Sequence, residues 1–256
     1  DKAFGKVSRN IGLLMRGSLV SPAVFFVLTS GCALSPGPEY GVYDPVESVN
    51  RRSYEISEAL DRSVLRPVAV GYRKVMPTFA EDAVKNFFAN IRSSESALSG
   101  FLQGAPKRGF RDTGRFVVNS TLGLGGLVDV ATALGMDAQG EDLGQVLASW
   151  GYTRSRYLYV PVLGPTTVRD LPHLIVRASL PRLAMRENYN AWVGTIDLAS
   201  ARAEVLMDTD VRDEASLDPY TFTREAFYQR RRDAVFNGEP PVEAGFDLLL
   251  EDFDEE

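Results

Sequence analysis

Residue types that support nucleophilic or metal chemistry are scarce in this sequence. Its 256 residues include one histidine, His173, and one cysteine, Cys32. A Ser-His-Asp or Cys-His site would have to use His173 as its base, and no Gly-x-Ser-x-Gly segment supplies an exposed nucleophile. A zinc site needs several Cys and His side chains together. We therefore predict no metal, no cofactor and no enzymatic activity, and we expect His173 at a surface or an interface.

The carboxylates leave one catalytic alternative open. The chain holds 34 Asp and Glu residues, and two carboxylates at a suitable distance are enough for acid-base hydrolysis. The sequence gives no such geometry, so a hydrolase stays the minor alternative.

A glycine-rich apolar segment is the most unusual feature of the chain. In VNSTLGLGGLVDV, Val118–Val130, Gly123, Gly125 and Gly126 stand among leucines. A dinucleotide-binding GxGxxG pattern would need glycine where Val128 stands, and no Gly-Lys-Ser/Thr follows, so a phosphate-binding loop is excluded. The glycines instead let the chain reverse direction and let two backbones approach closely.

Apolar residues flank these glycines on both sides, and no charged residue occurs from Val117 to Val128. The pattern predicts a helical hairpin whose two short arms are joined at Gly123–Gly126. In a soluble protein such a hairpin is buried core, whereas beside a bilayer it can enter the lipid. Evidence from the rest of the sequence is needed to choose between a buried hairpin and one that enters the lipid.

The first residues have the pattern of an export signal. Four basic residues precede a short apolar run at residues 19–28, and LTSGC follows, ending at Cys32. This arrangement is similar to a bacterial lipobox, in which the cysteine becomes the lipid-modified first residue. Thr29 stands where a large aliphatic residue is usual. We expect residues 1–31 to be a lipoprotein signal peptide and Cys32 to be the lipid anchor; a plain secreted protein is the alternative.

The charge of the chain limits its partners. The formal net charge is -6, and residues 1–31 hold four basic residues and one acidic residue, so their removal leaves -9. An acidic protein of this kind does not offer the basic surface that nucleic acid requires. Nor does it bind anionic lipid through its charge, so any membrane affinity must come from the anchor and from apolar surface.

Periodicity and helix-end signals predict an all-α domain. Residues 32–43 form a Pro- and Gly-containing tether, residues 44–238 the helical domain, and residues 239–256 an acidic, disordered tail. No βαβ alternation occurs. We expect helices at residues 44–64, beginning at Asp44 and Pro45; at 79–91; at 93–103, ending before Gly104; from Pro106 to the glycines; at 141–150; after a Thr167–Asp170 capping box; at 189–206; and from Asp218 to Gly238. We expect residues 157–163 to be extended.

Several segments, in order, resemble the MlaA (VacJ) lipoproteins of the Gram-negative outer membrane. The resemblance covers about residues 44–232. The matching segments are DPVESVNR (44–51), RPVAVGYRKVMP (66–77), VKNFFANI (84–91), FLQG (101–104), GRFVVNSTLGLGGLVDVA (114–131), DLGQVLASWG (142–151), YLYVPVLGPTTVRD (157–170) and DPYTFTREAFYQRR (218–231). Residues 171–187 match no segment of the family, and the acidic tail differs in detail.

The resemblance implies a fold, a place and a task. The fold is an all-α, ring-shaped helical protein with an amphipathic central channel and a glycine-rich hairpin. The place is the periplasmic face of the outer membrane, where such proteins associate with trimeric porins. The task is to remove mislocalised phospholipids from the outer leaflet and pass them to a soluble periplasmic carrier, without ATP.

Within this implied mechanism the hairpin is the gate of the channel. Its residues are Asn119, Leu122, Gly123, Leu124, Gly125, Gly126 and Leu127. A structural porin-associated lipoprotein without transport activity is the alternative, and a phospholipase is a third. The sequence identifies neither the porin nor the direction of net lipid flow nor the side chains that line a channel.

Overall fold

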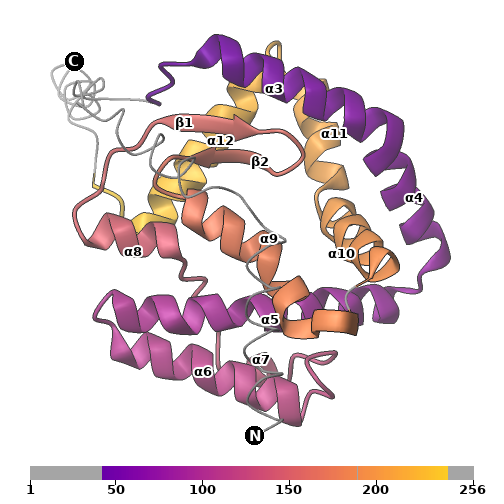
Figure 1. Cartoon of the computed structure of the whole chain (residues 1–256), viewed down its shortest axis with the longest axis vertical. Coiled ribbons are helices and arrows are strands. Elements are labelled where there is room, and N and C mark those ends of the chain that lie inside the picture. Colours follow the sequence, from indigo (N-terminus) through magenta and orange to yellow (C-terminus); the bar gives the residue numbers. More distant parts are fainter. Residues whose placement is uncertain (1–41, 189, 242–256) are drawn as a thin grey trace, which may run out of the picture. The chain divides into compact units, whose positions relative to one another are not determined.

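The computed structural model describes residues 42–188 and 190–241, which form helices and one small β-hairpin (Figure 1). This confirms the predicted all-α class. The predicted signal peptide, Cys32, and most of the tether and the acidic tail lie outside the described residues. The elements in chain order are α3 (Glu47–Leu60), the π-helical turn η1 (Asp61–Leu65), α4 (Arg66–Val75), α5 (Thr78–Leu102), α6 (Pro106–Thr121), α7 (Val130–Ala133), α8 (Leu143–Ser149), β1 (Tyr157–Val160), β2 (Gly164–Thr167), α9 (Leu171–Met185), the 3-10 turn η2 (Arg186–Asn188), α10 (Ala191–Glu204), α11 (Leu206–Ala215) and α12 (Pro219–Val235).

Several helix ends follow the predicted signals. Pro106 opens α6 at a position where its missing N–H costs nothing. The Asp218 side chain accepts hydrogen bonds from the backbone N–H groups of Tyr220 and Thr221 and so caps α12. Gly104 follows α5 with φ +72°, the left-handed conformation that glycine adopts easily.

The beginning of the first helix was predicted wrongly. The helix α3 starts at Glu47, and Asp44 does not cap it. Instead the Asp44 carboxylate accepts hydrogen bonds from the Asn50 amide at 2.7 Å and from the Tyr220 hydroxyl. Asp44 therefore bonds Tyr220 of the distant helix α12 and not the backbone N–H groups at the start of α3.

The capping box before α9 was placed too early. The Thr167 hydroxyl donates a hydrogen bond to the Asp170 carboxylate and accepts one from the Asp170 backbone N–H. The helix α9 nevertheless starts only at Leu171, with Asp170 as its N-cap. Thr167 is the last residue of β2, and strand pairing with Tyr157 keeps it out of the helix.

Two predicted helices, residues 79–91 and 93–103, are one 25-residue helix, α5. The hydroxyls of Ser93 and Ser94 bond back to the carbonyls of Asn90 and Ile91 within the helix, which satisfies these polar side chains without a break. The long helix packs against α6 along its second half. Gly100 allows this approach, because a Cβ there would lie 2.7 Å from the backbone nitrogen of Gly109.

The extended segment forms the strand β1, which pairs with β2 in antiparallel register, Tyr157 with Thr167 and Val160 with Gly164. Pro161 follows the strand and lies in the turn, where it removes no ladder hydrogen bond. Tyr157 is 1% exposed and packs edge-to-face against Tyr220 of α12, which does the same with Tyr54 of α3. These three tyrosines join α3, the β-hairpin and α12 in one buried cluster.

The predicted helix 189–206 is α10, which ends at Glu204, and a second helix, α11, begins at Leu206. The apolar stripe of α10 does not face the core as a whole. Trp192 is 79% exposed, while the buried residues of α10 include Asp197 and Ser200. The buried face of α10 thus carries Asp197 and Ser200 beside Ala199, while Trp192, Ile196 and Leu198 are exposed.

None of the described helices is both long enough and apolar enough to cross a membrane.

Candidate functional site

The glycine segment forms a tight turn between a long helix and a very short one. After α6 ends at Thr121 the chain turns through residues 122–127 and enters α7 at Val130. Leu124, Gly125 and Gly126 have φ values of +54°, +75° and +96°. Such angles are costly for residues with a Cβ, which explains the two glycines in this position. The second arm of the predicted hairpin is a single helical turn that packs on α6.

The three glycines meet different surroundings. A Cβ at Gly123 would lie 2.2 Å from the Val128 carbonyl oxygen, and one at Gly126 would lie 2.7 Å from the Asn90 side chain on α5. A Cβ at Gly125 would meet nothing within 4 Å. Gly123 and Gly126 therefore allow close packing, whereas Gly125 serves the backbone conformation alone.

The base of the turn is held by polar side chains. Asn119 is 6% exposed; its amide nitrogen donates to Asp129 at 2.9 Å, and its oxygen accepts from the Ala131 N–H at 2.8 Å. The Arg115 guanidinium donates to Asp129 at 3.1 Å. Burial by itself would raise the pKa of Asp129, but hydrogen bonds from Thr132 and Asn119 and the charge of Arg115 outweigh it and lower this pKa to about 2. Asn119 is thus a fixed point beneath the turn.

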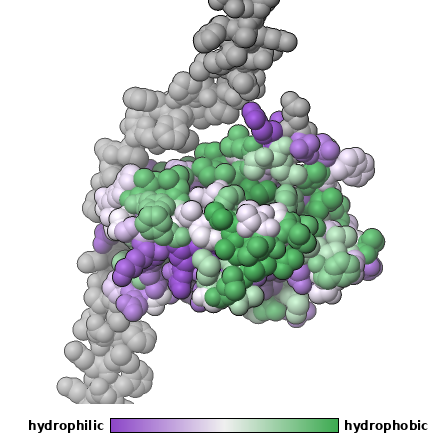
Figure 2. All heavy atoms as spheres, turned by 90° about the horizontal axis from the view of Figure 1, so that it is seen from below, coloured by the Kyte–Doolittle hydropathy of each residue, from purple (hydrophilic) through white to green (hydrophobic). Residues whose placement is uncertain are grey.

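The tip of the turn is apolar and exposed. Leu122 and Leu124 are 67% and 71% exposed, and Leu127 and Val128 are also exposed. Figure 2 looks from below onto the side where α6 lies and shows a broad apolar area there. The tip is therefore not buried core, which removes the first of the two alternatives for this segment. Large exposed apolar areas of this kind mark contact with lipid or with another protein.

A row of charged residues follows one face of α5. Lys85, Arg92 and Glu95 share a face with the buried Phe88, at the spacing that usually carries apolar core residues. Each has a partner on another helix: Glu204 of α10 at 2.5 Å, Asp197 of α10 at 2.5 Å, and His173 of α9 at 3.0 Å, respectively. The sequence signal for this row is the helical spacing of Lys85, Arg92 and Glu95 with Phe88, and these charged residues were not among the predicted site residues.

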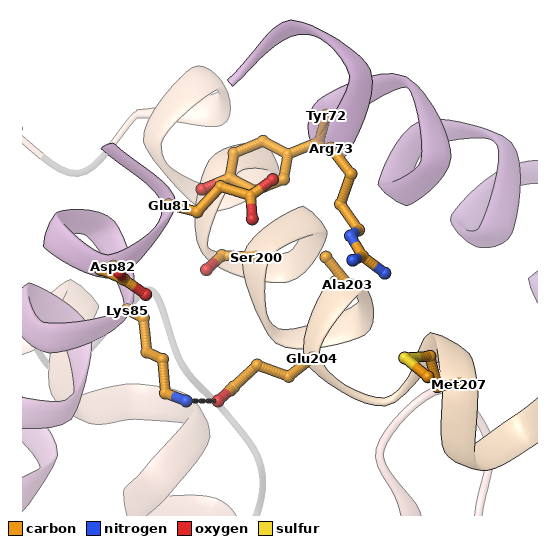
Figure 3. Close-up of a pocket in the computed structure, with 9 residues that line it drawn as sticks. All are labelled: Tyr72, Arg73, Glu81, Asp82, Lys85, Ser200, Ala203, Glu204 and Met207. Atoms are coloured by element: carbon orange, nitrogen blue, oxygen red, sulfur yellow. Dashed lines mark ion pairs between the residues drawn. The ribbon is translucent and has the colours of Figure 1, made fainter. Parts of the chain in front are cut away.

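The row ends at a cavity of about 270 Å³ between α4, α5, α10 and α11. Figure 3 shows the ion pair of Lys85 and Glu204 at one side of this cavity and Arg73 and Glu81 toward the other. The lining is mixed, polar and apolar; it comprises Tyr72, Arg73, Glu81, Asp82, Lys85, Ser200, Ala203, Glu204 and Met207. Charged groups of both signs line this cavity.

His173 was expected at a surface or an interface, and it is partly buried between helices. Its Nδ1 lies 3.0 Å from a Glu95 oxygen, and Glu95 is itself 6% exposed. Among the described residues no serine or threonine hydroxyl hydrogen-bonds the ring.

The first and last matching segments, which the sequence analysis did not connect, meet in space. Arg51 donates two hydrogen bonds to Asp218, at 3.1 and 2.7 Å, and its guanidinium lies 4.4 Å from the centre of the Tyr220 ring. Arg224 reaches back to Asp44 at 3.4 Å. The hydrogen bonds from Arg51 hold the pKa of Asp218 well below its ordinary value. We name these residues and Asn50 the α3–α12 clasp, because their hydrogen bonds join the two ends of the helical body.

Comparison with known proteins agrees with this architecture. The family model of the MlaA lipoproteins matches residues 42–234. The intermembrane phospholipid transport system lipoprotein MlaA of Shigella flexneri is 33% identical over 231 residues, 88% of this chain and 90% of that one. An uncharacterized protein of Rickettsia prowazekii is 30% identical over 197 residues, 76% of this chain and 78% of that one.

A solved structure agrees as well. It was described as the structural basis for maintenance of bacterial outer membrane lipid asymmetry. Its chain is 30% identical, with a TM-score of 0.64, and the match covers 77% of this chain and 99% of that one. The match thus includes almost the whole of the solved chain. On the family model, the relatives and the shared fold together, this chain belongs to the MlaA lipoprotein family.

Proposed function

We propose that this protein takes part in phospholipid transport that maintains the lipid asymmetry of a bacterial outer membrane. It removes mislocalised phospholipids from the outer leaflet through an amphipathic channel and passes them to a soluble periplasmic carrier. The process is a passive partition and needs no catalytic residue. Membership of the MlaA family, whose members from Shigella flexneri and other bacteria carry the transport name, supports this proposal.

One structural observation supports it most directly: an exposed apolar turn stands on the same helical body as a row of ion pairs that runs from the buried Glu95 to the exposed Lys85. A phospholipid needs an apolar path for its chains and a polar path for its head group. Leu122 and Leu124 offer the first, and the row from Glu95 to the cavity at Lys85 offers the second.

The glycine turn is our candidate for the gate of this channel. Its tip, residues 122–127, is tied to α5 by the contact of Gly126 with Asn90 and rests on the fixed base at Asn119. A rearrangement at Gly125, where no neighbour is within 4 Å of a Cβ position, could move the exposed leucines while the base stays in place.

Place and partners are part of the same proposal. The anchor is Cys32 at the periplasmic face of the outer membrane, and a trimeric porin and the soluble carrier are the protein partners. The exposed apolar side chains of the glycine turn support contact with the bilayer.

The test is phospholipid exposure on the surface of a deletion strain, with the wild-type chain or a Cys32→Ala chain restored. We expect phospholipid to accumulate in the outer leaflet on deletion and to be cleared by the wild-type chain alone. Unchanged lipid asymmetry on deletion would contradict transport and favour a structural, porin-associated lipoprotein. Release of fatty acid by the purified chain would favour a phospholipase.

A further inference from the structure

The turn between the two β-strands carries three apolar residues in a row at the protein surface. Pro161, Val162 and Leu163 connect Val160 of β1 to its strand partner Gly164 of β2. Val162 and Leu163 are 47% and 49% exposed. A run of exposed apolar residues is unfavourable in water unless it serves a contact. We name residues 161–163 the β-turn tip.

Val162 also has an unfavourable backbone conformation. Its φ is +70°, a region that L-residues avoid because the Cβ crowds the backbone, and β-branched residues adopt it least of all. A turn with proline in its second position and a positive φ in its third is typical of type II, in which glycine is the usual third residue. Valine at this position therefore costs stability that glycine would not cost.

The strained turn is held in place from α3. The Ser57 hydroxyl accepts a hydrogen bond from the Val162 backbone N–H at 3.1 Å, and Ser57 is 8% exposed. This bond fixes the backbone of the turn, while about half of the Val162 side chain stays exposed. The side chain thus brings strain without full burial, a combination that is typical of residues that contact another molecule.

The surroundings of the β-turn tip offer no free charge to a ligand. Residues 157–168 include no charged residue. On α3, which packs against β1, Glu58 accepts two hydrogen bonds from Arg212 of α11, at 2.9 and 3.0 Å. In η1, Asp61 accepts two from Arg202 of α10, at 2.5 and 2.9 Å. A charged ligand would find these partners already taken, so the tip favours an apolar ligand.

The glycine turn shows the same combination of strain and exposure. Leu124 has a φ of +54° and is 71% exposed. Among the described residues other than glycine, a positive φ occurs only at Leu124, Val162, Arg186 and Asn237, and asparagine adopts it readily. Both apolar residues of this set therefore stand in exposed apolar turns. Lipid is the ligand that we proposed for Leu124, and the same ligand fits the second turn.

We propose that the β-turn tip is an acyl-chain contact, at which Val162 and Leu163 bind a hydrocarbon chain of a phospholipid during its transport. This inference deepens the proposed function and rests on it. The ligand class is a hydrocarbon chain, whatever head group it carries. Glycine at position 162 would relieve the strain but would lose the apolar side chain that meets the lipid.

The test separates stability from binding at this one position. Val162→Gly should raise the thermal unfolding midpoint by about 2–4 °C, because it relieves the left-handed conformation. The same variant should bind dihexanoyl-phosphatidylcholine about threefold to tenfold more weakly, because one apolar side chain is lost. Both are measured on the full chain in amphipol. Dibutanoyl-phosphatidylcholine, which has shorter chains and the same head group, should lose less affinity.

Two further variants at the same position are the matched controls. Val162→Ile keeps both the strain and an apolar branched side chain, so its midpoint and its lipid affinity should stay close to those of the wild type. Val162→Asn tolerates a positive φ but is polar. It should therefore raise the midpoint and weaken lipid binding, as Val162→Gly does.

Photo-labelling locates the contact without any substitution. A phospholipid with a diazirine in its acyl chain should label residues 161–163 of the wild-type chain, whereas one with a diazirine in its head group should not.

Several outcomes would overturn the inference. The first is wild-type affinity of Val162→Gly for dihexanoyl-phosphatidylcholine, and the second is equal labelling of the tip by both diazirine lipids. A third is weaker co-purification of Val162→Gly with a porin or a carrier at unchanged lipid affinity, which would assign the tip to a protein partner. Unchanged lipid asymmetry in a deletion strain would contradict the transport proposal instead, while leaving the measured acyl-chain binding in place.

Discussion

At the scale of single residues, the three glycines of the turn have separate jobs. Gly126 lies against Asn90 and has a left-handed φ, so a side chain there meets both a steric and a conformational penalty. A side chain at Gly125 would meet only the conformational penalty. Asn90 also donates to Ser120 at 2.9 Å, which ties the same contact to the end of α6. The turn is therefore packed against α5 at Gly126, whereas there is free space around Gly125.

This difference predicts unequal effects of alanine. Gly126→Ala should lower the free energy of unfolding by about 2–4 kcal/mol, the sum of an overpacked contact and a left-handed residue. Gly125→Ala should cost about 1 kcal/mol. Urea unfolding of the two variants measures both values.

Gly71 in the middle of α4 provides the control, because a Cβ there would meet nothing within 4 Å and its φ is helical. Gly71→Ala should raise stability by about 0.5–1 kcal/mol. Equal losses at Gly125 and Gly126 would show that the Asn90 contact does not restrain the turn.

At the scale of elements, the α3–α12 clasp joins the beginning and the end of the helical body. Asn50 extends it to the β-hairpin, because its side chain bonds the Tyr157 carbonyl at 3.2 Å and the Tyr159 N–H at 3.0 Å. Asn50 is 2% exposed. The clasp thus closes contacts between segments more than a hundred residues apart, which supports the tyrosine cluster beneath it.

The clasp predicts a stability difference between two adjacent arginines. Arg51→Ala should cost about 1–2 kcal/mol, less than a fully buried charge-assisted pair because Arg51 and Asp218 are partly exposed. Arg52→Ala, which removes only the exposed pair with Glu55, should cost about 0.5 kcal/mol or less. Thermal or urea unfolding compares the two. A cost at Arg52 as large as at Arg51 would argue against the clasp.

At the scale of the whole molecule, the negative net charge and the exposed apolar surface have different consequences for binding to a bilayer. The chain carries a net charge of -6, yet many large apolar side chains of the described residues are exposed, with those of the glycine turn among them. An acidic protein gains no membrane affinity from anionic lipid. We therefore expect its affinity for a bilayer to depend on these apolar side chains and on the proposed anchor at Cys32.

The apolar tip can be tested with one position. In a Cys32→Ala chain, which lacks the anchor, Leu124→Glu should reduce partition into phospholipid vesicles at least about tenfold, because a charge resists entry into lipid. Leu124→Met keeps the apolar character and should leave partition unchanged. Vesicle flotation measures both. Equal partition of the two variants would mean that the tip does not enter the bilayer.

The sequence by itself determined the helical class and most helix ends. Pro106, Gly104 and Asp218 act within one turn of their own backbone, so their effects are local and can be predicted from residue type. The glycine spacing likewise predicted a reversal of the chain after α6. The break at Ser93 was predicted wrongly, because its hydroxyl bonds back to the Asn90 carbonyl within the helix. The cap at Asp44 was predicted wrongly, because its carboxylate instead accepts a hydrogen bond from Tyr220 of the distant α12.

The tertiary structure alone decided which charges meet. Lys85, Arg92 and Glu95 have partners 78 to 119 residues away in the chain, and Arg51 finds Asp218 across 167 residues. No local pattern encodes such pairs, since any of many acids could satisfy each arginine. Only the packing of α9 and α10 on α5 shows which acids are taken. The physical reason is that electrostatic pairing depends on distance in space and not on separation along the chain.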